Sequence, residues 1–190
     1  MKKNSLSTNS RVYAAFLRGI NVGGNTVIKM DDLKKLFVAA GFLNVKTILA
    51  SGNVVFESEE TKTNIIAKTI GSRLEKMAGR EISVIVKSLD DLRKLEARQP
   101  FKSIQLTPQT KAYITFVPEI KKSSNTSKPV IFKECTILEV FDGMVVSVLH
   151  KDPKLGTLDL MGVIEQQFGK QVTTRNWNTI GKVLKAGSAG

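Results

Sequence analysis

A glycine-rich loop is the segment of this chain whose residue types are best suited to bind a ligand. It reads Arg18-Gly19-Ile20-Asn21-Val22-Gly23-Gly24-Asn25 and directly follows the apolar run Val12 to Leu17. Glycines let backbone N–H groups approach a ligand, and a loop that enters a helix N-terminus presents such donors to an anion. The guanidinium of Arg18 adds a planar fork that suits phosphate or carboxylate. We therefore expect an anion site with Arg18, Asn21, Gly23 and Gly24 as contacts.

The same loop allows a second interpretation. It matches neither Gly-x-Gly-x-x-Gly nor the Walker sequence, so both standard nucleotide fingerprints are missing. A glycine-rich turn can also bond its own backbone through Arg and Asn side chains and so tie two lobes together. The residues alone leave the ligand-binding and the structural interpretation open.

The elements around the loop predict a second segment beside it. Apolar patterns indicate strands at residues 12–17, 45–49, 53–57 and 82–86, and helices at 30–40 and 66–77. This β-α-β-β-α-β order is the split, ferredoxin-like pattern, in which strands one and three are antiparallel neighbours. The end of strand one then lies beside the start of strand three. We therefore add Ser51 and Asn53 to the candidate site.

The second half of the chain predicts a smaller α+β subdomain. Residues 112–117, 130–141 and 144–149 are strand-like, with Asp142-Gly143 as a hairpin turn, and apolar stripes from Leu160 and from Trp177 indicate two helices. We expect an α+β protein with flexible tails at 1–10 and 187–190. The ferredoxin-like subdomain would span 11–99, and the second subdomain would span 100–186 and pack on the first.

A third segment near the C-terminus contains Arg175 and Asn176. It reads Thr173-Thr174-Arg175-Asn176-Trp177. Thr174 or Asn176 can cap the last helix, and Trp177 begins its apolar stripe. Arg175 has no capping role, so it lines a cleft or pairs with a carboxylate. Arg175 and Asn176 join the candidate site only if the last helix docks at the same edge.

The chain offers little for metal or covalent chemistry. It has one histidine and one cysteine, which cannot form a zinc site of the usual kind. Three acidic pairs, Asp31-Asp32, Glu59-Glu60 and Asp90-Asp91, fall at predicted helix beginnings, where they favour the helix dipole. Cys135 is interpreted as a small buried hydrophobe and His150 as a hairpin-end residue. We assign no catalytic residue, metal or cofactor, and enzyme activity stays open.

Composition sets the broad class. The chain has 190 residues, 42% of them hydrophobic, and no apolar run approaches the roughly 20 residues of a membrane span. The first ten residues lack the apolar core of a signal peptide, so a cytoplasmic location is expected. The net charge of +12 is spread over both halves. Such a field favours polyanions, or it is simply a solvated lysine-rich surface.

Recognition of RNA by base stacking is disfavoured. In RNA-recognition modules of this topology, strand three has a Lys/Arg-Gly-aromatic pattern with stacking aromatic side chains. Here that strand reads Ser51-Gly52-Asn53-Val54-Val55-Phe56 and lacks the paired aromatics.

Three segments together resemble the bacterial "domain of unknown function 1697" family. They are residues 15–24, residues 51–56 and residues 174–179, in this order, within a resemblance that spans Val12 to Leu184. The resemblance implies a small α+β protein of two subdomains, the first ferredoxin-like, and implies no established activity. Residues 154–157 depart from the glycine- and serine-containing segment of the family in that region.

Three functions follow as hypotheses. The first is binding of a phosphate- or carboxylate-bearing small molecule at the glycine-rich loop. The second is charge-driven binding of nucleic acid, in which scattered lysines matter more than Arg18. The third is a structural or partner-binding module without a ligand. The oligomeric state is not encoded in any pattern of the sequence.

Overall fold

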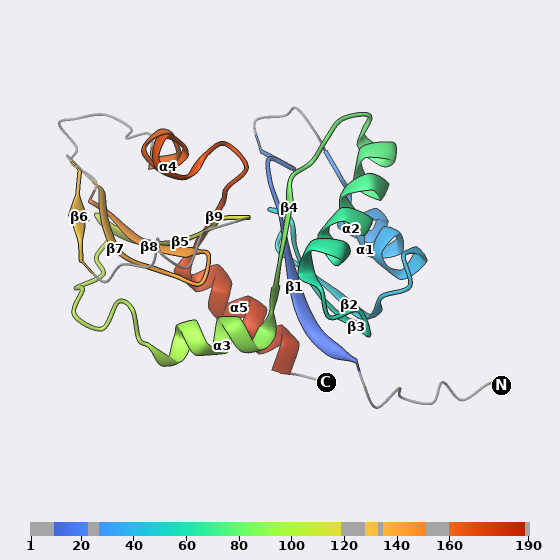
Figure 1. Ribbon diagram of the computed structural model, residues 1–190, viewed down its shortest axis with the longest axis horizontal. Helices are drawn as coiled ribbons and strands as arrows, with labels where there is room; N and C mark the ends of the chain where they lie inside the picture. The colour runs from blue at the N-terminus through green and yellow to red at the C-terminus, as the bar shows by residue number, and fades with distance from the viewer. Residues whose placement is uncertain (1–9, 23–26, 119–127, 133–134, 151–159, 189–190) are drawn as a thin grey trace. The chain divides into compact units, whose positions relative to one another are not determined.

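The computed structural model describes residues 10–22, 27–118, 128–132, 135–150 and 160–188 (Figure 1). The backbone forms two compact units, Met1–Asp91 with Val183–Gly190, and Leu92–Lys182. The divisions fall inside two helices, α3 (Leu89–Ala97) and α5 (Trp177–Ser188). Each unit is an α+β structure built on its own antiparallel sheet.

The first unit has the predicted ferredoxin-like arrangement. Its sheet order is β2-β3-β1-β4, and β1 lies antiparallel to both β3 and β4. Helices α1 and α2 cover one face of this sheet (Figure 1). The elements are β1 (Arg11–Leu17), α1 (Met30–Ala39), β2 (Leu43–Ile48), β3 (Asn53–Ser58), α2 (Thr63–Ala78) and β4 (Val84–Ser88).

The core of the first unit lies between this sheet and its two helices. Alternate residues of β1, among them Tyr13 and Leu17, face the helices and are almost fully buried. Phe42 and Phe56 pack with ring centroids 4.6 Å apart, and Phe37 lies 5.3 Å from Phe56. These aromatic contacts fix the α1–β2 connection against β3.

Two of the three acidic pairs lie at helix beginnings, and the third does not. Asp31-Asp32 and Asp90-Asp91 lie in the first turns of α1 and α3, as predicted. The interpretation of Glu59-Glu60 as a helix beginning is wrong, because α2 begins at Thr63 and has no acidic residue in its first turn. Asp91 N–H donates to the hydroxyl of Ser88 at 3.1 Å, so Ser88 caps α3.

The second unit is built on a five-stranded antiparallel sheet in the order β6-β7-β8-β5-β9. The β7–β8 hairpin turns at Asp142 and Gly143, whose φ angles of 46° and 73° suit a two-residue turn. Residues of α4 pack with β7 and β8 in one apolar core. The elements are β5 (Thr110–Phe116), β6 (Val130–Ile131), β7 (Cys135–Phe141), β8 (Met144–His150), α4 (Leu160–Phe168) and β9 (Thr173–Asn176).

Strand β9 is the element that the sequence pattern missed. We expected Thr174 or Asn176 to cap the last helix and predicted no strand here, but residues 173–176 pair with β5, with Thr174 opposite Thr115. The two threonine hydroxyls are 2.7 Å apart. A run of β-branched residues from Val172 to Thr174 was the available strand signal.

Among the described residues, no helix is both long and apolar enough to cross a membrane.

Cys135 gives a direct test of the second core. Its side chain is fully buried, and burial raises the pKa of the thiol from 9.0 to about 11. We expect the native protein to resist thiol reagents at pH 8 and to react after unfolding. The unfolded thiol loses its proton above pH 9 while the folded thiol keeps it. The free energy of unfolding should therefore fall between pH 9 and about pH 11.

Urea denaturation at several pH values measures the free energy of unfolding. In the control variant Cys135→Ala, the fall in this free energy between pH 9 and about pH 11 that the thiol causes should disappear. Rapid labelling of the native thiol at pH 8 would contradict the buried position of Cys135.

Candidate functional site

The end of β1 meets the turn between β2 and β3, as the topology predicts. Leu17 N–H donates to the carbonyl of Gly52 at 2.8 Å. The side-chain amide of Asn21 donates to the carbonyl of Ala50, also at 2.8 Å. The described part of the glycine-rich loop and the 51–53 segment are therefore neighbours in space. The described candidate residues of the first unit, Arg18, Asn21, Ser51 and Asn53, lie at one end of its sheet.

Asn21 holds the loop together from inside. Its Nδ2 donates to the carbonyls of Ile28 and Ala50, and its Oδ1 accepts from Ile28 N–H at 2.7 Å. Its backbone is left-handed, with a φ of 55°, a conformation that asparagine tolerates better than most residues. Both polar atoms of the side chain therefore bond to backbone groups. This is the structural role expected if the loop is stabilised by its own asparagine side chains.

Asn53 has a similar role in the neighbouring turn. The side chain is fully buried, and its Nδ2 donates to the carbonyl of Ile48 at 2.8 Å and to the hydroxyl of Ser51 at 3.2 Å. These contacts close the turn that carries Leu49 at a φ of 60°. The buried side-chain amide of Asn53 thus provides a hydrogen-bond donor for the backbone carbonyl of Ile48 at the other end of the turn.

Two arginines, Arg18 and Arg80, lie at the loop, and the sequence pattern indicated only Arg18. Arg18 is half-buried directly after β1, and its backbone N–H donates to the carbonyl of Ser83 at 2.9 Å. Arg80 is exposed, and its Nη2 donates to the carbonyl of Gly19 at 2.9 Å. The only signal for Arg80 was its place directly after Gly79, the left-handed C-cap of α2.

Gly52 is the tightest position of this junction. Its φ is 79°, and a Cβ built there would lie 2.8 Å from the side chain of Ile20 and 3.0 Å from the Cβ of Leu17. Only glycine lets the turn approach the end of β1 this closely. Gly23 and Gly24 lie outside the described residues.

Arg175 and Asn176 belong to strand β9 of the second unit. Arg175 is nine-tenths buried, and its Nη1 donates to Thr173 Oγ1 at 2.8 Å and to the Thr174 carbonyl at 2.9 Å. Burial lowers the pKa of its guanidinium to about 10, so it stays charged at neutral pH. Asn176 Oδ1 accepts from Asn178 N–H at 2.9 Å and so caps α5, as predicted.

Metal coordination has no support in the described part of the chain. No group of three or more His, Cys, Asp or Glu side chains is placed there to hold an ion. Cys135 is buried, and His150 is exposed at the end of β8.

By its fold, the chain is an α+β protein with a ferredoxin-like unit and a second unit built on a five-stranded antiparallel sheet. A family model described as a protein of unknown function, DUF1697, matches residues 11–134. The chain belongs to that family. The match includes the loop and the 51–56 segment, whereas the 174–179 segment lies beyond it.

A solved structure has the same fold. It is described as the structure of the conserved bacterial protein SP0830 from Streptococcus pneumoniae. The similarity has a TM-score of 0.71 at 21% sequence identity and covers 94% of this chain and 99% of that one. A search of the curated proteins found no match.

A pair of glycines tests the junction. We expect Gly52→Ala to destabilise the protein more than Gly19→Ala. Both residues have positive φ angles, but only at Gly52 does the new Cβ meet other atoms. The left-handed backbone costs about 1–2 kcal/mol at either site, and overpacking adds about 1–3 kcal/mol at Gly52.

Urea denaturation of the two variants provides the comparison. Equal loss of stability would contradict the close approach of the turn to the end of β1.

Proposed function

We propose that this protein binds a small molecule bearing phosphate or carboxylate at the end of β1. The observation that supports this proposal is that two arginines come together at one glycine-containing loop: Arg18 belongs to the loop, and Arg80, just after α2, bonds to its Gly19 carbonyl. Asn21 bonds to the Ile28 and Ala50 backbone and holds the described part of this loop in place. Guanidinium groups form strong paired hydrogen bonds with such anions. The half-buried hydroxyl of Ser51 is a further candidate contact on the neighbouring turn.

The contacts of the asparagines refine the candidate set. Asn21 and Asn53 bond to backbone groups of the loop and turn, so in this proposal they position the site and do not touch the ligand. The arginines provide the charge. The contacts proposed for Gly23, Gly24, Arg175 and Asn176 stay predictions.

A thermal-shift screen with inorganic phosphate, nucleotides and di- and tricarboxylates tests the proposal. A ligand at about 100 times its Kd stabilises by about 2.7 kcal/mol, which raises the Tm of a protein of this size by about 5–10 °C. We expect Arg18→Ala and Arg80→Ala each to remove most of the shift. Arg11→Ala is the matched control, because Arg11 is exposed at the opposite end of β1.

Two results would contradict the proposal. The first is the absence of a shift with every anion. The second is a shift that Arg18→Ala and Arg80→Ala leave intact. A loss of stability in Arg18→Ala without any ligand effect would support the purely structural role.

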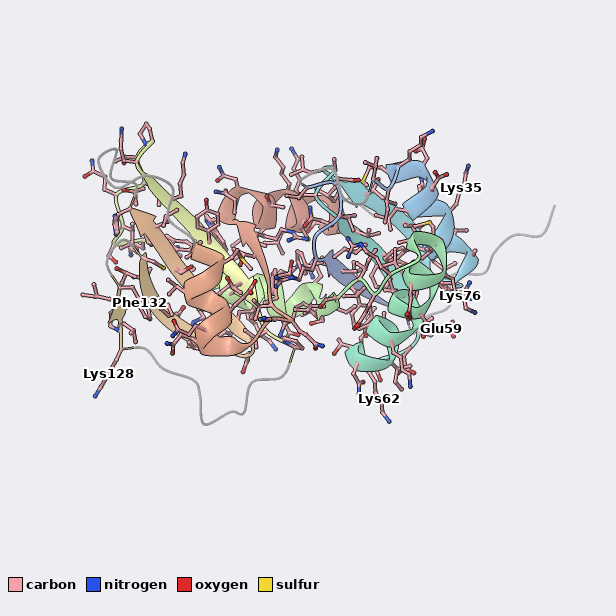
Figure 2. The ribbon with its side chains drawn as sticks, turned by 90° about the horizontal axis from the view of Figure 1, so that it is seen from above. Lys35, Glu59, Lys62, Lys76, Lys128 and Phe132 are labelled. Carbon is pink, nitrogen blue, oxygen red and sulfur yellow. The ribbon has the colours of Figure 1, made fainter. Side chains whose placement is uncertain are left out.

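Charge-driven binding of nucleic acid is a second candidate, favoured by the helix layer of the first unit. Lys35, Lys62 and Lys76 project outward from this layer (Figure 2). In α1, in α2 and at their ends, exposed basic residues outnumber exposed acidic ones. The basic residues are Lys29, Lys34, Lys35, Lys62, Lys68, Arg73, Lys76 and Arg80. Stacking on the strands is not part of this proposal, because Tyr13 and Phe56 are buried in the helix-facing core.

This candidate predicts affinity for RNA or DNA that falls linearly with salt on a log–log plot. Replacing Lys35 and Lys76 together by glutamine should reduce the salt slope by about 1–2, whereas Ser51→Ala should leave it unchanged. Fluorescence anisotropy with a single-stranded oligonucleotide measures the slope. Absence of binding at low salt would rule this function out.

A further inference from the structure

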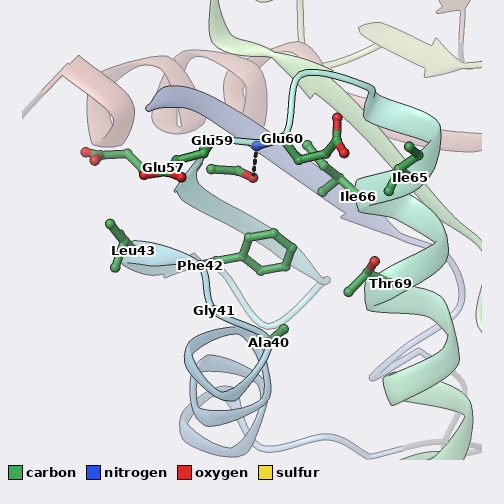
Figure 3. A pocket seen from close by; sticks show the side chains of 11 residues that line it. Ala40, Gly41, Phe42, Leu43, Glu57, Glu59, Glu60, Ile65, Ile66 and Thr69 are labelled. Atoms are coloured by element: carbon green, nitrogen blue, oxygen red, sulfur yellow. Dashed lines mark hydrogen bonds between the residues drawn. The ribbon is translucent and has the colours of Figure 1, made fainter. Parts of the chain in front are cut away.

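The first unit has a pocket at the other end of its sheet. It lies where the α1–β2 connection, the end of β3 and the start of α2 come together, and it encloses about 430 Å³ (Figure 3). Arg11 at the start of β1 pairs with Ser58 of the pocket wall, whereas Leu17 at its other end bonds to Gly52 and directly precedes the glycine-rich loop. A strand of seven residues spans about 20 Å, so the two places are separate.

The floor of the pocket is apolar and rigid. The ring of Phe42 points into the space between the Glu57–Glu60 stretch and α2 (Figure 3). It is held from behind by Phe37 and Phe56, whose centroids lie 5.8 Å and 4.6 Å away. Ile66 lies beside it and is almost fully buried. A volume of this size with an aromatic floor is typical of a site for a small molecule.

The rim of the pocket is acidic. Glu57, Glu59 and Glu60 are the charged residues that line it, in a chain whose net charge is +12. A positively charged molecule would repel cations over much of its surface, so a purely acidic pocket is a local exception. Glu59 and Glu60 lie before the first turn of α2, which begins at Thr63.

Two of these carboxylates are held in fixed positions. Glu57 accepts from Asn44 Nδ2 at 2.8 Å and from the hydroxyl of Ser10 at 3.3 Å. Glu60 Oε1 accepts from Lys62 N–H at 2.8 Å. Ionised carboxylates have room for further hydrogen bonds after accepting these. The pocket therefore presents preorganised acceptors above an aromatic floor.

The geometry selects an organic cation over a metal ion. In the described part of the chain no three carboxylates come together as a metal site, so a small inorganic ion would lack its ligands. An ammonium group can bond to separate carboxylates and also lie against an aromatic ring, an arrangement that stabilises the charge. An attached carbon group would cover the remaining apolar floor.

We propose that this pocket binds a small organic ammonium ion with an apolar body. The charged nitrogen lies at the acidic rim, which Glu57 and Glu60 border from opposite sides (Figure 3), and the carbon body covers Phe42 and Ile66. Ser58, whose hydroxyl accepts from Glu60 N–H at 3.1 Å, can accept a second bond from the ammonium group. This inference does not depend on the anion site, since it rests on different residues and on charge of the opposite sign.

Titration of the full chain with phenethylamine, followed by NMR and calorimetry, tests the proposal. We expect saturable binding with a Kd of about 1 mM or below and shifts of the amides of Phe42, Ile65 and Thr69. The neutral analogue 2-phenylethanol and the anion phenylacetate should bind several-fold more weakly or not at all. Glu57→Gln and Glu60→Gln should each weaken binding by about threefold.

Glu75→Gln is the matched control. Glu75 is an exposed carboxylate of α2, the helix that forms one wall of the pocket, but it does not line the pocket itself. It should leave the Kd unchanged. Three results would overturn the proposal: no saturable binding of phenethylamine, equal binding of 2-phenylethanol, or equal weakening by Glu75→Gln. Self-association that is lost in Glu60→Gln would also overturn it, because a second copy would then be the occupant.

Discussion

The side chain of Asn21 makes the contacts on which the candidate anion site depends. Three backbone groups from two segments converge on one amide: the N–H and the carbonyl of Ile28 and the carbonyl of Ala50. An unpaired buried backbone group costs about as much as a lost hydrogen bond, so the amide stabilises both the loop and the neighbouring turn. Arg18 and Ser51 have defined positions only because this junction exists.

The junction also explains why the turn beside it must be tight. Leu17 N–H bonds to Gly52, and the space that a side chain at this position would need is taken by Ile20. The resulting left-handed backbone at Gly52 suits glycine alone. Arg18 on the loop and Arg80 beside it are then presented by backbone that Asn21 and the turn hold in place, and anion binding depends on such preorganisation.

Several features were predictable from the sequence because they follow from local patterns. Apolar periodicity located the strands and helices of the first unit, and their order predicted the contact between residues 18–21 and the 51–53 segment. Asp142-Gly143 marked the turn of the β7–β8 hairpin correctly. The predictions of a buried Cys135 and a cap at Asn176 are also confirmed.

Other features were not predictable because they depend on partners far away in sequence. Whether an asparagine bonds to a ligand or to backbone is decided by the segment that faces it, so Asn21 could not be assigned. Arg80 reaches Gly19 across 61 positions and has no local pattern. Glu59-Glu60 looked like a helix beginning, but α2 starts later and the pair lines a pocket. Strand β9 is short and lies next to a helix, which obscured its pairing.

Amide hydrogen exchange at Ile28 most directly tests the claim that Asn21 holds this junction. Its N–H donates to Asn21 Oδ1 at 2.7 Å, although Ile28 lies outside the helices and strands. Exchange should be strongly slowed in the wild-type protein and fast in Asn21→Ala, while the amide of Val55 in β3 stays protected in both. Fast exchange of Ile28 in the wild-type protein would contradict the account.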